Sequence, residues 1–153
     1  MTKQQRSAVH VILPLLIGGL MYICLRDPNL RMFQWFDFIG AGSLITRLRF
    51  NVAPLQTAIP FWIQFSVPNA LWVYSLTGFM ALLWSGTDSR FKPFWLSLGI
   101  LLGAGAEFGQ AINVIPGTFD IVDLCLCLIA AALALLTTSY LPSIKRRLND
   151  FPT

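Results

Sequence analysis

Charge is scarce in this chain of 153 residues, because only 12% of them are charged whereas 56% are hydrophobic and the mean hydropathy is positive. An ordinary soluble domain carries about 25% charged residues. The composition therefore excludes that class and indicates a membrane protein. We expect a single membrane domain, residues 1–153, with an all-α fold.

Histidine and cysteine are also scarce, which argues against sites that depend on them, such as metal and redox sites. The one histidine, His10, lies near the start of an apolar run, and we interpret it as an interfacial residue. The three cysteines, Cys24, Cys125 and Cys127, form no CxxC pair and have no histidine partner, so we interpret them as buried thiols. No metal site is therefore predicted, and any cofactor stays unassigned.

Recognisable catalytic and nucleic-acid motifs are missing as well. The sequence has no HExxH and no serine–histidine or cysteine–histidine arrangement, so acyl transfer by a catalytic triad is not expected. It has no nucleotide-binding loop. Its basic residues flank the apolar runs and form no separate patch, which indicates membrane topology and no nucleic-acid partner. Any catalytic residue remains unknown at this stage.

Four apolar segments dominate what the sequence does contain. A helix needs about 20 residues to cross ~30 Å of hydrocarbon. We predict transmembrane helices at about residues 8–25, 68–85, 93–113 and 119–141, the second with Pro68 near its start. No small-x-small cleavage site follows the first segment, so we expect an uncleaved span there.

The region between the first two spans has a different character. Residues 30–66 mix arginines and aspartates with many aromatic side chains, a composition typical of the headgroup level of a bilayer. We predict an interfacial or re-entrant helical segment here, in the first outer loop. A connection between Pro54 and Pro60 would then lead into the second span.

The basic residues predict the orientation. With four spans, seven of the eleven Lys and Arg residues share one face: Lys3, Arg6, Arg90, Lys92, Lys145, Arg146 and Arg147. Positive residues concentrate on the cytoplasmic side of membrane proteins. We therefore expect both termini in the cytoplasm of a bacterium and the protein in its inner membrane.

Intramembrane carboxylates give the candidate site. Glu107 and Gln110 are three residues apart, as are Asp120 and Asp123, so each pair shares one helix face. A short turn joins the two helices, and we expect the four side chains to converge in a polar pocket at the outer face. Carboxylates at bilayer depth are costly and are usually functional.

Structural explanations compete with this one. Asp120 falls in the first turn of its helix, where a carboxylate stabilises the free N–H groups. Glu107 and Asp123 would pair with Arg47 or Arg49 of the long loop as buried ion pairs. The glycine pairs Gly99/Gly103 and Gly105/Gly109 predict close approach of another helix, which keeps Glu107 away from lipid.

The same residues carry a family resemblance. The strings EFGQ (residues 107–110) and IPGTFDIVDL (residues 115–124) resemble the signature of the VanZ-like membrane proteins. Thr118 stands where that family usually has arginine, and Cys127 where asparagine is common. Ala70, four residues before Tyr74, stands where a histidine is frequent. The chain is thus similar to a divergent member.

The resemblance implies a cell-envelope protein whose family includes proteins linked to low-level resistance to the glycopeptide teicoplanin. It implies that Glu107, Gln110, Asp120 and Asp123 line the family's shared polar site. From the residues themselves we expect the site to bind a lipid-linked or other envelope ligand, with Arg47 and Arg49 contacting phosphate.

Two alternatives come from other functional classes. The chain would be a membrane enzyme that uses its Glu and Asp cluster as acid and base on a lipid-linked substrate. Otherwise it would be an accessory subunit of a larger membrane complex with a membrane protein partner. The bilayer is the partner common to all three hypotheses.

Overall fold

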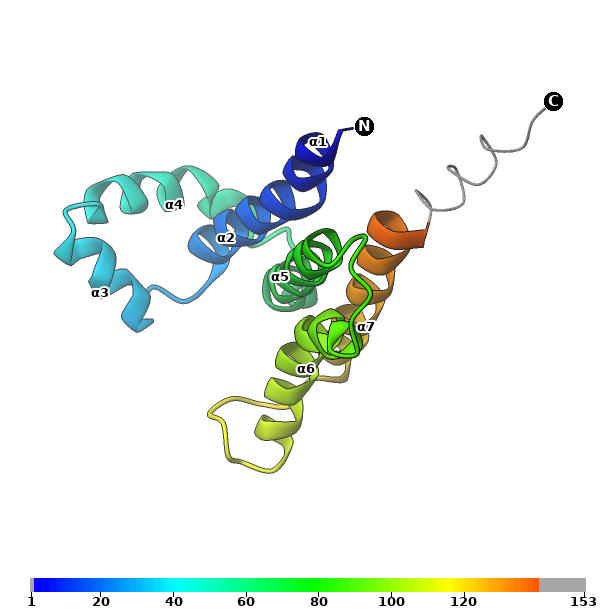
Figure 1. Cartoon of the computed structure of the whole chain (residues 1–153). Helices are drawn as coiled ribbons and strands as arrows, with labels where there is room; N and C mark the ends of the chain where they lie inside the picture. The colour runs from blue at the N-terminus through cyan, green and yellow to red at the C-terminus, as the bar shows by residue number, and fades with distance from the viewer. Residues whose placement is uncertain (1, 141–153) are drawn as a thin grey trace.

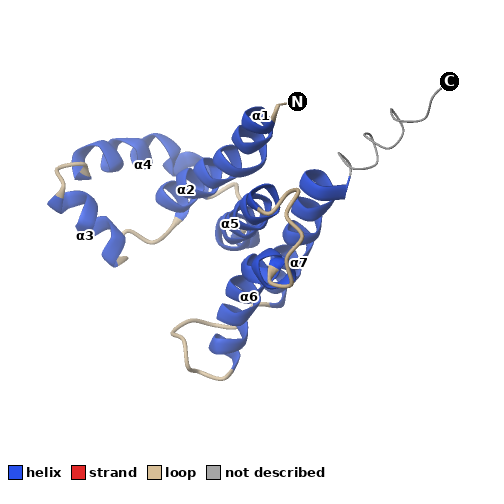
Figure 2. Cartoon of the chain, viewed as in Figure 1, coloured by secondary structure: helices blue, strands red, loops and turns tan. Residues whose placement is uncertain are grey.

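The structure is a computed structural model that describes residues 2–140, and all regular structure in that range is helical (Figures 1 and 2). The predicted all-α fold is confirmed. The elements are α1 (Lys3–Ser7), η1 (Ala8–Ile12), α2 (Leu13–Leu25), α3 (Arg31–Phe38), α4 (Gly42–Gln56), α5 (Phe61–Leu83), α6 (Lys92–Ala111), α7 (Ile121–Leu135) and η2 (Leu136–Tyr140). The predicted end of the last span and the basic residues at 145–147 lie outside the described residues.

Three of the helical stretches are long and apolar enough to cross a membrane: Gln4–Leu25, Phe61–Leu83 and Ile121–Thr138. The chain is therefore a helical membrane protein. Helix α6 covers the predicted third span but is not among the three. It is less apolar because it includes Lys92, Glu107 and Gln110 as well as four glycines.

Helix α5 is the central element, and it packs against α2, α6 and α7 (Figure 1). Contacts along its length give the direction of each neighbour. Gly18 of α2 lies against Trp72, whereas His10 lies against Gly78, so the first helix runs antiparallel to α5. Gly99 of α6 lies against Thr77 and Gly103 against Val73, so α6 is antiparallel to α5 too.

Helix α7 runs parallel to α5. Its first turn reaches Asn69 through Asp123, and η2, which follows it directly, reaches Tyr74 through Thr137. The chain therefore passes the length of the bundle four times in alternating directions. One end of the bundle carries the loops at residues 26–60 and 112–120, and the other carries the start of the chain and the loop at residues 84–91.

The first helix is continuous through α1, η1 and α2, with a wider π turn at Ala8–Ile12. The turn lies directly before Pro14. A proline ring in a helix clashes with the carbonyl four residues earlier, here that of His10, and the wider turn gives the ring room. The predicted apolar span thus keeps its helix in spite of an internal proline.

The second spanning helix begins at Phe61, earlier than the predicted start near Pro68. Pro68 lies inside α5 and is buried, so this placement was wrong. The segment at residues 30–66, for which an interfacial or re-entrant placement stays a prediction, contains two short helices: α4 packs on α2, and α3 packs on α4 (Figure 1). Helix α4 continues through Pro54 to Gln56, which shortens the predicted connection.

Small side chains make the closest contacts in the bundle. Gly99 and Gly103 of α6 face α5, where a Cβ would collide with Thr77 and Val73 respectively. The predicted close approach is confirmed for this pair. Gly105 faces open space and Gly109 packs on the turn after α6, so the second glycine pair does not serve helix packing.

Candidate functional site

The turn between α6 and α7 is built by backbone conformations that few residues adopt. Gly117 has φ +141°, which favours glycine, and Asn113 has φ +59°. The N–H groups of Val114 and Ile115 both donate to the carbonyl of Gly109, which closes the end of α6. This turn sets the first residues of α7 beside the last turns of α6.

Three carboxyl groups and one amide meet next to this turn, and we call Glu107, Asp120, Asp123 and Asn69 the acidic site. The backbone N–H of Asp120 donates to Oε2 of Glu107 at 3.0 Å. Nδ2 of Asn69 donates to Oδ2 of Asp123 at 2.8 Å. Glu107 and Asp123 thus lie on neighbouring helices, α6 and α7, which the bond from Asp120 to Glu107 joins.

Burial differs within the acidic site. Glu107 is 4% exposed and Asp123 8% exposed, so both carboxyl groups are removed from lipid and water. Asp120 is only partly buried, and the whole turn from Asn113 to Phe119 is exposed. The turn is therefore the exposed edge of the acidic site, and Asp120 lies between it and the two deep carboxyl groups.

Asp120 is also the N-cap of α7. Its Oδ1 accepts a hydrogen bond from the N–H of Val122 at 2.8 Å. The predicted stabilising role at this helix start is therefore present. The Asp120 N–H also donates to Glu107, so the side chain of Glu107 on α6 is hydrogen-bonded to the N-cap residue of α7.

Gln110 does not join the other predicted residues. Its side chain packs on Gly117, where a Cβ would lie 2.8 Å from its Nε2. Gln110 is thus held by the turn, and the structure brings together Glu107, Asp120 and Asp123.

The arginines of the long loop lie elsewhere. Nη1 of Arg49 donates to the carbonyl of Ile23 at 2.6 Å, and Nη2 donates to that of Arg26 at 2.7 Å. The alternative in which Arg49 pairs with Glu107 or Asp123 is therefore wrong. Arg47 is exposed on α4. Arg49 instead ties α4 to the C-terminal end of α2.

Asn69 was not predicted from the sequence. It lies on α5, far along the chain from α6 and α7, and it supplies the amide donor to Asp123. A polar residue next to Pro68 in an apolar run is the signal that was available. Cys127 follows one turn after Asp123, with its Sγ 4.0 Å from Oδ1, the distance of a weak S–H donor.

A second polar group, also missed, joins three helices near the other end of the bundle. Nδ1 of His10 lies 2.7 Å from Oη of Tyr74, which lies 3.0 Å from Oγ1 of Thr137. His10 belongs to η1 and Thr137 to η2, so both π turns take part. The interpretation of His10 as a plain interfacial residue omitted this bond.

Further bonds reinforce the same end. Oγ of Ser75 donates to the carbonyl of Val11 at 2.7 Å, and Arg6 donates to the carbonyl of Thr138. A π turn leaves carbonyls less regularly paired, and side chains of neighbouring helices supply the missing donors.

Within residues 2–140, no group of three or more His, Cys, Asp or Glu side chains is placed to hold a metal ion. No family model, curated protein or solved structure matches this chain.

Proposed function

We propose that the chain is a VanZ-like protein of the bacterial inner membrane whose acidic site binds a cationic group of an envelope ligand. In this proposal α6 also crosses the membrane, which makes four spans, and both termini are cytoplasmic. The alternating direction of the four long helices supports it. So does the basic charge of Arg6, Arg90 and Lys92 at the end opposite the acidic site.

The observation that carries the proposal is a pair of buried carboxyl groups, Glu107 and Asp123, on neighbouring helices that the bond from Asp120 to Glu107 joins. The hydrogen-bond partners that the described part of the chain gives Glu107 and Asp123 are the Asp120 N–H, the Asn69 amide and the Cys127 thiol, none of which is a cation. Two ionised carboxylates buried on neighbouring helices repel each other in a medium of low dielectric constant. A positive charge between them, carried by an ammonium group or a proton, stabilises the pair.

The remaining acceptor capacity suits an ammonium ligand. Each carboxyl oxygen accepts more than one hydrogen bond, and the structure gives Glu107 one backbone donor and Asp123 one amide donor. A primary ammonium group has three N–H donors, enough to bridge both carboxylates. Arg47 and Arg49 lie in the loop at the same end of the bundle, where phosphate groups of an envelope ligand would meet them.

The test uses variants that keep shape and remove charge. Glu107→Gln and Asp123→Asn are expected to abolish the teicoplanin resistance that the wild-type chain confers on a susceptible bacterium, while protein abundance in the membrane is unchanged. Asp88→Asn, an exposed acid in the loop between α5 and α6, is the matched control and is expected to keep full resistance.

The proposal fails if the two acidic-site variants protect cells as well as the Asp88 control does. It also fails if the wild-type chain accumulates in the membrane without changing susceptibility to teicoplanin.

One observation favours an enzyme as the second candidate. Paired carboxyl groups in different surroundings are the usual arrangement for a general acid and a general base, and Asp123 has an amide partner that Glu107 lacks. We expect purified protein to convert a lipid-linked envelope precursor in this case, with activity lost in Asp123→Asn. Absence of turnover for such precursors would exclude this candidate.

A further inference from the structure

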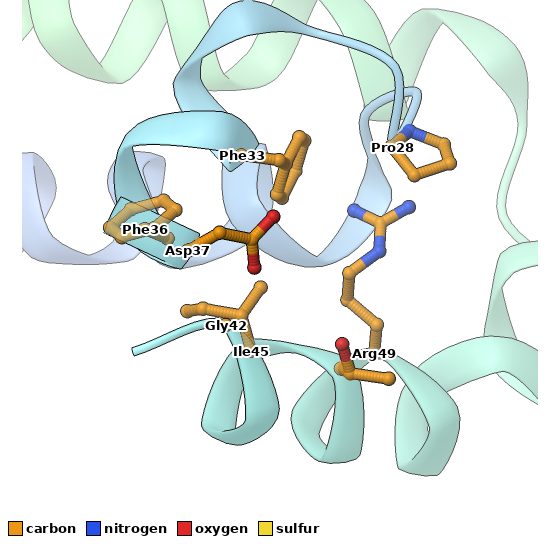
Figure 3. Close-up of a pocket in the computed structure, with 8 residues that line it drawn as sticks. Pro28, Phe33, Phe36, Asp37, Gly42, Ile45 and Arg49 are labelled. Atoms are coloured by element: carbon orange, nitrogen blue, oxygen red, sulfur yellow. The ribbon is translucent and has the colours of Figure 1, made fainter. Parts of the chain in front are cut away.

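We propose that a pocket between α3 and α4 binds the phosphoethanolamine headgroup of a membrane phospholipid. The pocket is a cavity of about 300 Å³, lined by Phe33, Phe36 and Asp37 of α3 and by Ile45 and Arg49 of α4 (Figure 3). It is separate from the acidic site, and of the residues named in the proposed function it shares only Arg49.

The pocket lies at the level of the lipid headgroups. Arg49 holds α4 to the carbonyls of Ile23 and Arg26, at the C-terminal end of a helix that is long and apolar enough to span the membrane. The end of a spanning helix lies at the membrane–water boundary. The two helices that form the pocket also carry large exposed aromatic side chains: Trp35 and Phe38 on α3 and Phe50 on α4. Such rings are enriched at this boundary.

Arg49 provides the phosphate contact. Its guanidinium group has five N–H donors, and the two carbonyl bonds occupy only two of them. The group lies 4.8 Å from the ring centroid of Phe33, which fixes the plane of its donors beside the cavity. A phosphate oxygen in the pocket would therefore meet an oriented cation.

Asp37 provides the ammonium contact from the facing wall (Figure 3). Its carboxylate rests over Gly42, where a Cβ would occupy the place of Oδ1. The rings of Phe33 and Phe36 line the same cavity, and aromatic faces attract ammonium groups. The wall thus offers a carboxylate acceptor and two aromatic faces for one cation.

The two charges together select the ligand class. A phosphate on its own would meet Arg49 but would be repelled by Asp37. A choline headgroup would bring a cation without N–H donors for the carboxylate. Phosphoethanolamine combines an anionic phosphate with a primary ammonium group, so both charges in the pocket are matched.

The experiment measures lipid retention by the purified full chain in detergent, using native mass spectrometry. The protein is mixed with equal amounts of phosphatidylethanolamine, phosphatidylcholine and phosphatidylglycerol that have the same acyl chains. Wild-type protein is expected to retain phosphatidylethanolamine about tenfold over the other two, the size of effect that one charge-assisted contact gives. Asp37→Asn is expected to lose this preference, and Asp88→Asn is expected to keep it.

A second variant moves the Asp37 carboxylate and leaves its charge in place. The added methyl group in Gly42→Ala would collide with Oδ1, which is the free end of a flexible side chain and so gives way without unfolding α4. We expect the same loss of preference. Equal retention of the three lipids by wild-type protein, or equal behaviour of the Asp37 and Asp88 variants, would overturn the proposal.

Two further arms separate the alternatives. In the first, millimolar soluble phosphoethanolamine competes with bound phosphatidylethanolamine. If the lipid stays bound, the site takes the membrane lipid; if the lipid is displaced, the site takes the headgroup from either source. Glu107→Gln is expected to leave lipid retention unchanged, so a failure at the acidic site is distinguished from a failure here.

Discussion

At the scale of single residues, the hydroxyl of Tyr74 is the clearest target, because it bridges His10 and Thr137. We expect Tyr74→Phe to lower the free energy of unfolding by about 0.5–2 kcal/mol, since it removes the partner of the His10 Nδ1 and breaks the link to Thr137. The Thr137 hydroxyl keeps its bonds to the carbonyls of Leu133 and Ala134. Thermal unfolding of the purified protein in detergent, followed by circular dichroism, measures this change.

Tyr22→Phe is the matched control for the Tyr74 variant. The ring of Tyr22 packs on Trp72 at 5.1 Å between centroids, and within the described residues its hydroxyl shows no hydrogen bond. Removing that hydroxyl should leave the unfolding midpoint where it is. Equal midpoints for the two variants would show that the contact with His10 and Thr137 contributes nothing to stability.

The acidic site shows what single residues reveal before a structure exists. Helix periodicity and a short turn were enough to group Glu107, Asp120 and Asp123, because all three belong to adjacent segments of the chain. Asn69 was out of reach, since its contact with Asp123 depends on how α5 packs. The prediction that Gln110 lines the pocket was wrong, because Gly117 has no Cβ and the Gln110 side chain packs against it.

At the scale of elements, the contact between α5 and α6 depends on Gly99. A Cβ at this position would collide with Oγ1 of Thr77 and would approach the carbonyl oxygen of Val73 to 3.0 Å. The backbone oxygen cannot move aside easily, so Gly99→Ala should separate the helices and cost about 1–3 kcal/mol of stability. Thermal unfolding in detergent reports the loss.

Gly105 gives this prediction its control on the same helix. A Cβ there meets nothing within 4 Å, so Gly105→Ala should leave stability unchanged or raise it slightly through its better helix propensity. If Gly105→Ala destabilises the protein as much as Gly99→Ala, the close contact between α5 and α6 is not the reason for the loss.

The start of α5 shows why element boundaries were harder to predict than the elements themselves. Prolines usually mark helix starts, and Pro68 was interpreted in that way. In the structure the helix already begins at Phe61, and Gln64 in its first turn donates to the carbonyls of Gln56 and Ile59. These bonds give the carbonyls of Gln56 and Ile59 a donor and stabilise the start of α5 at Phe61. Hydropathy alone does not reveal such bonds.

At the scale of the whole molecule, α6 decides the topology. Helix α6 runs antiparallel to its neighbours α5 and α7. It is less apolar than the three helices that are long and apolar enough to span a membrane. In the four-span arrangement that we propose, α5 and α7 cover Glu107 and the glycine face of α6. The number of four spans stays a prediction, which the alternating directions of the helices support.

A test of this topology places single cysteines at Asn113, after α6, and at Ser89, before it. The background replaces Cys24, Cys125 and Cys127 by alanine, so that only the new thiol reacts. If α6 crosses the membrane, a membrane-impermeant maleimide should label Asn113→Cys in intact cells, whereas Ser89→Cys should react only after the cells are opened. If α6 does not cross, both thiols would lie on one side and label together. Labelling of Asn113→Cys from the cytoplasm alone would move the acidic site to the inner face and remove the basis for binding an envelope ligand there.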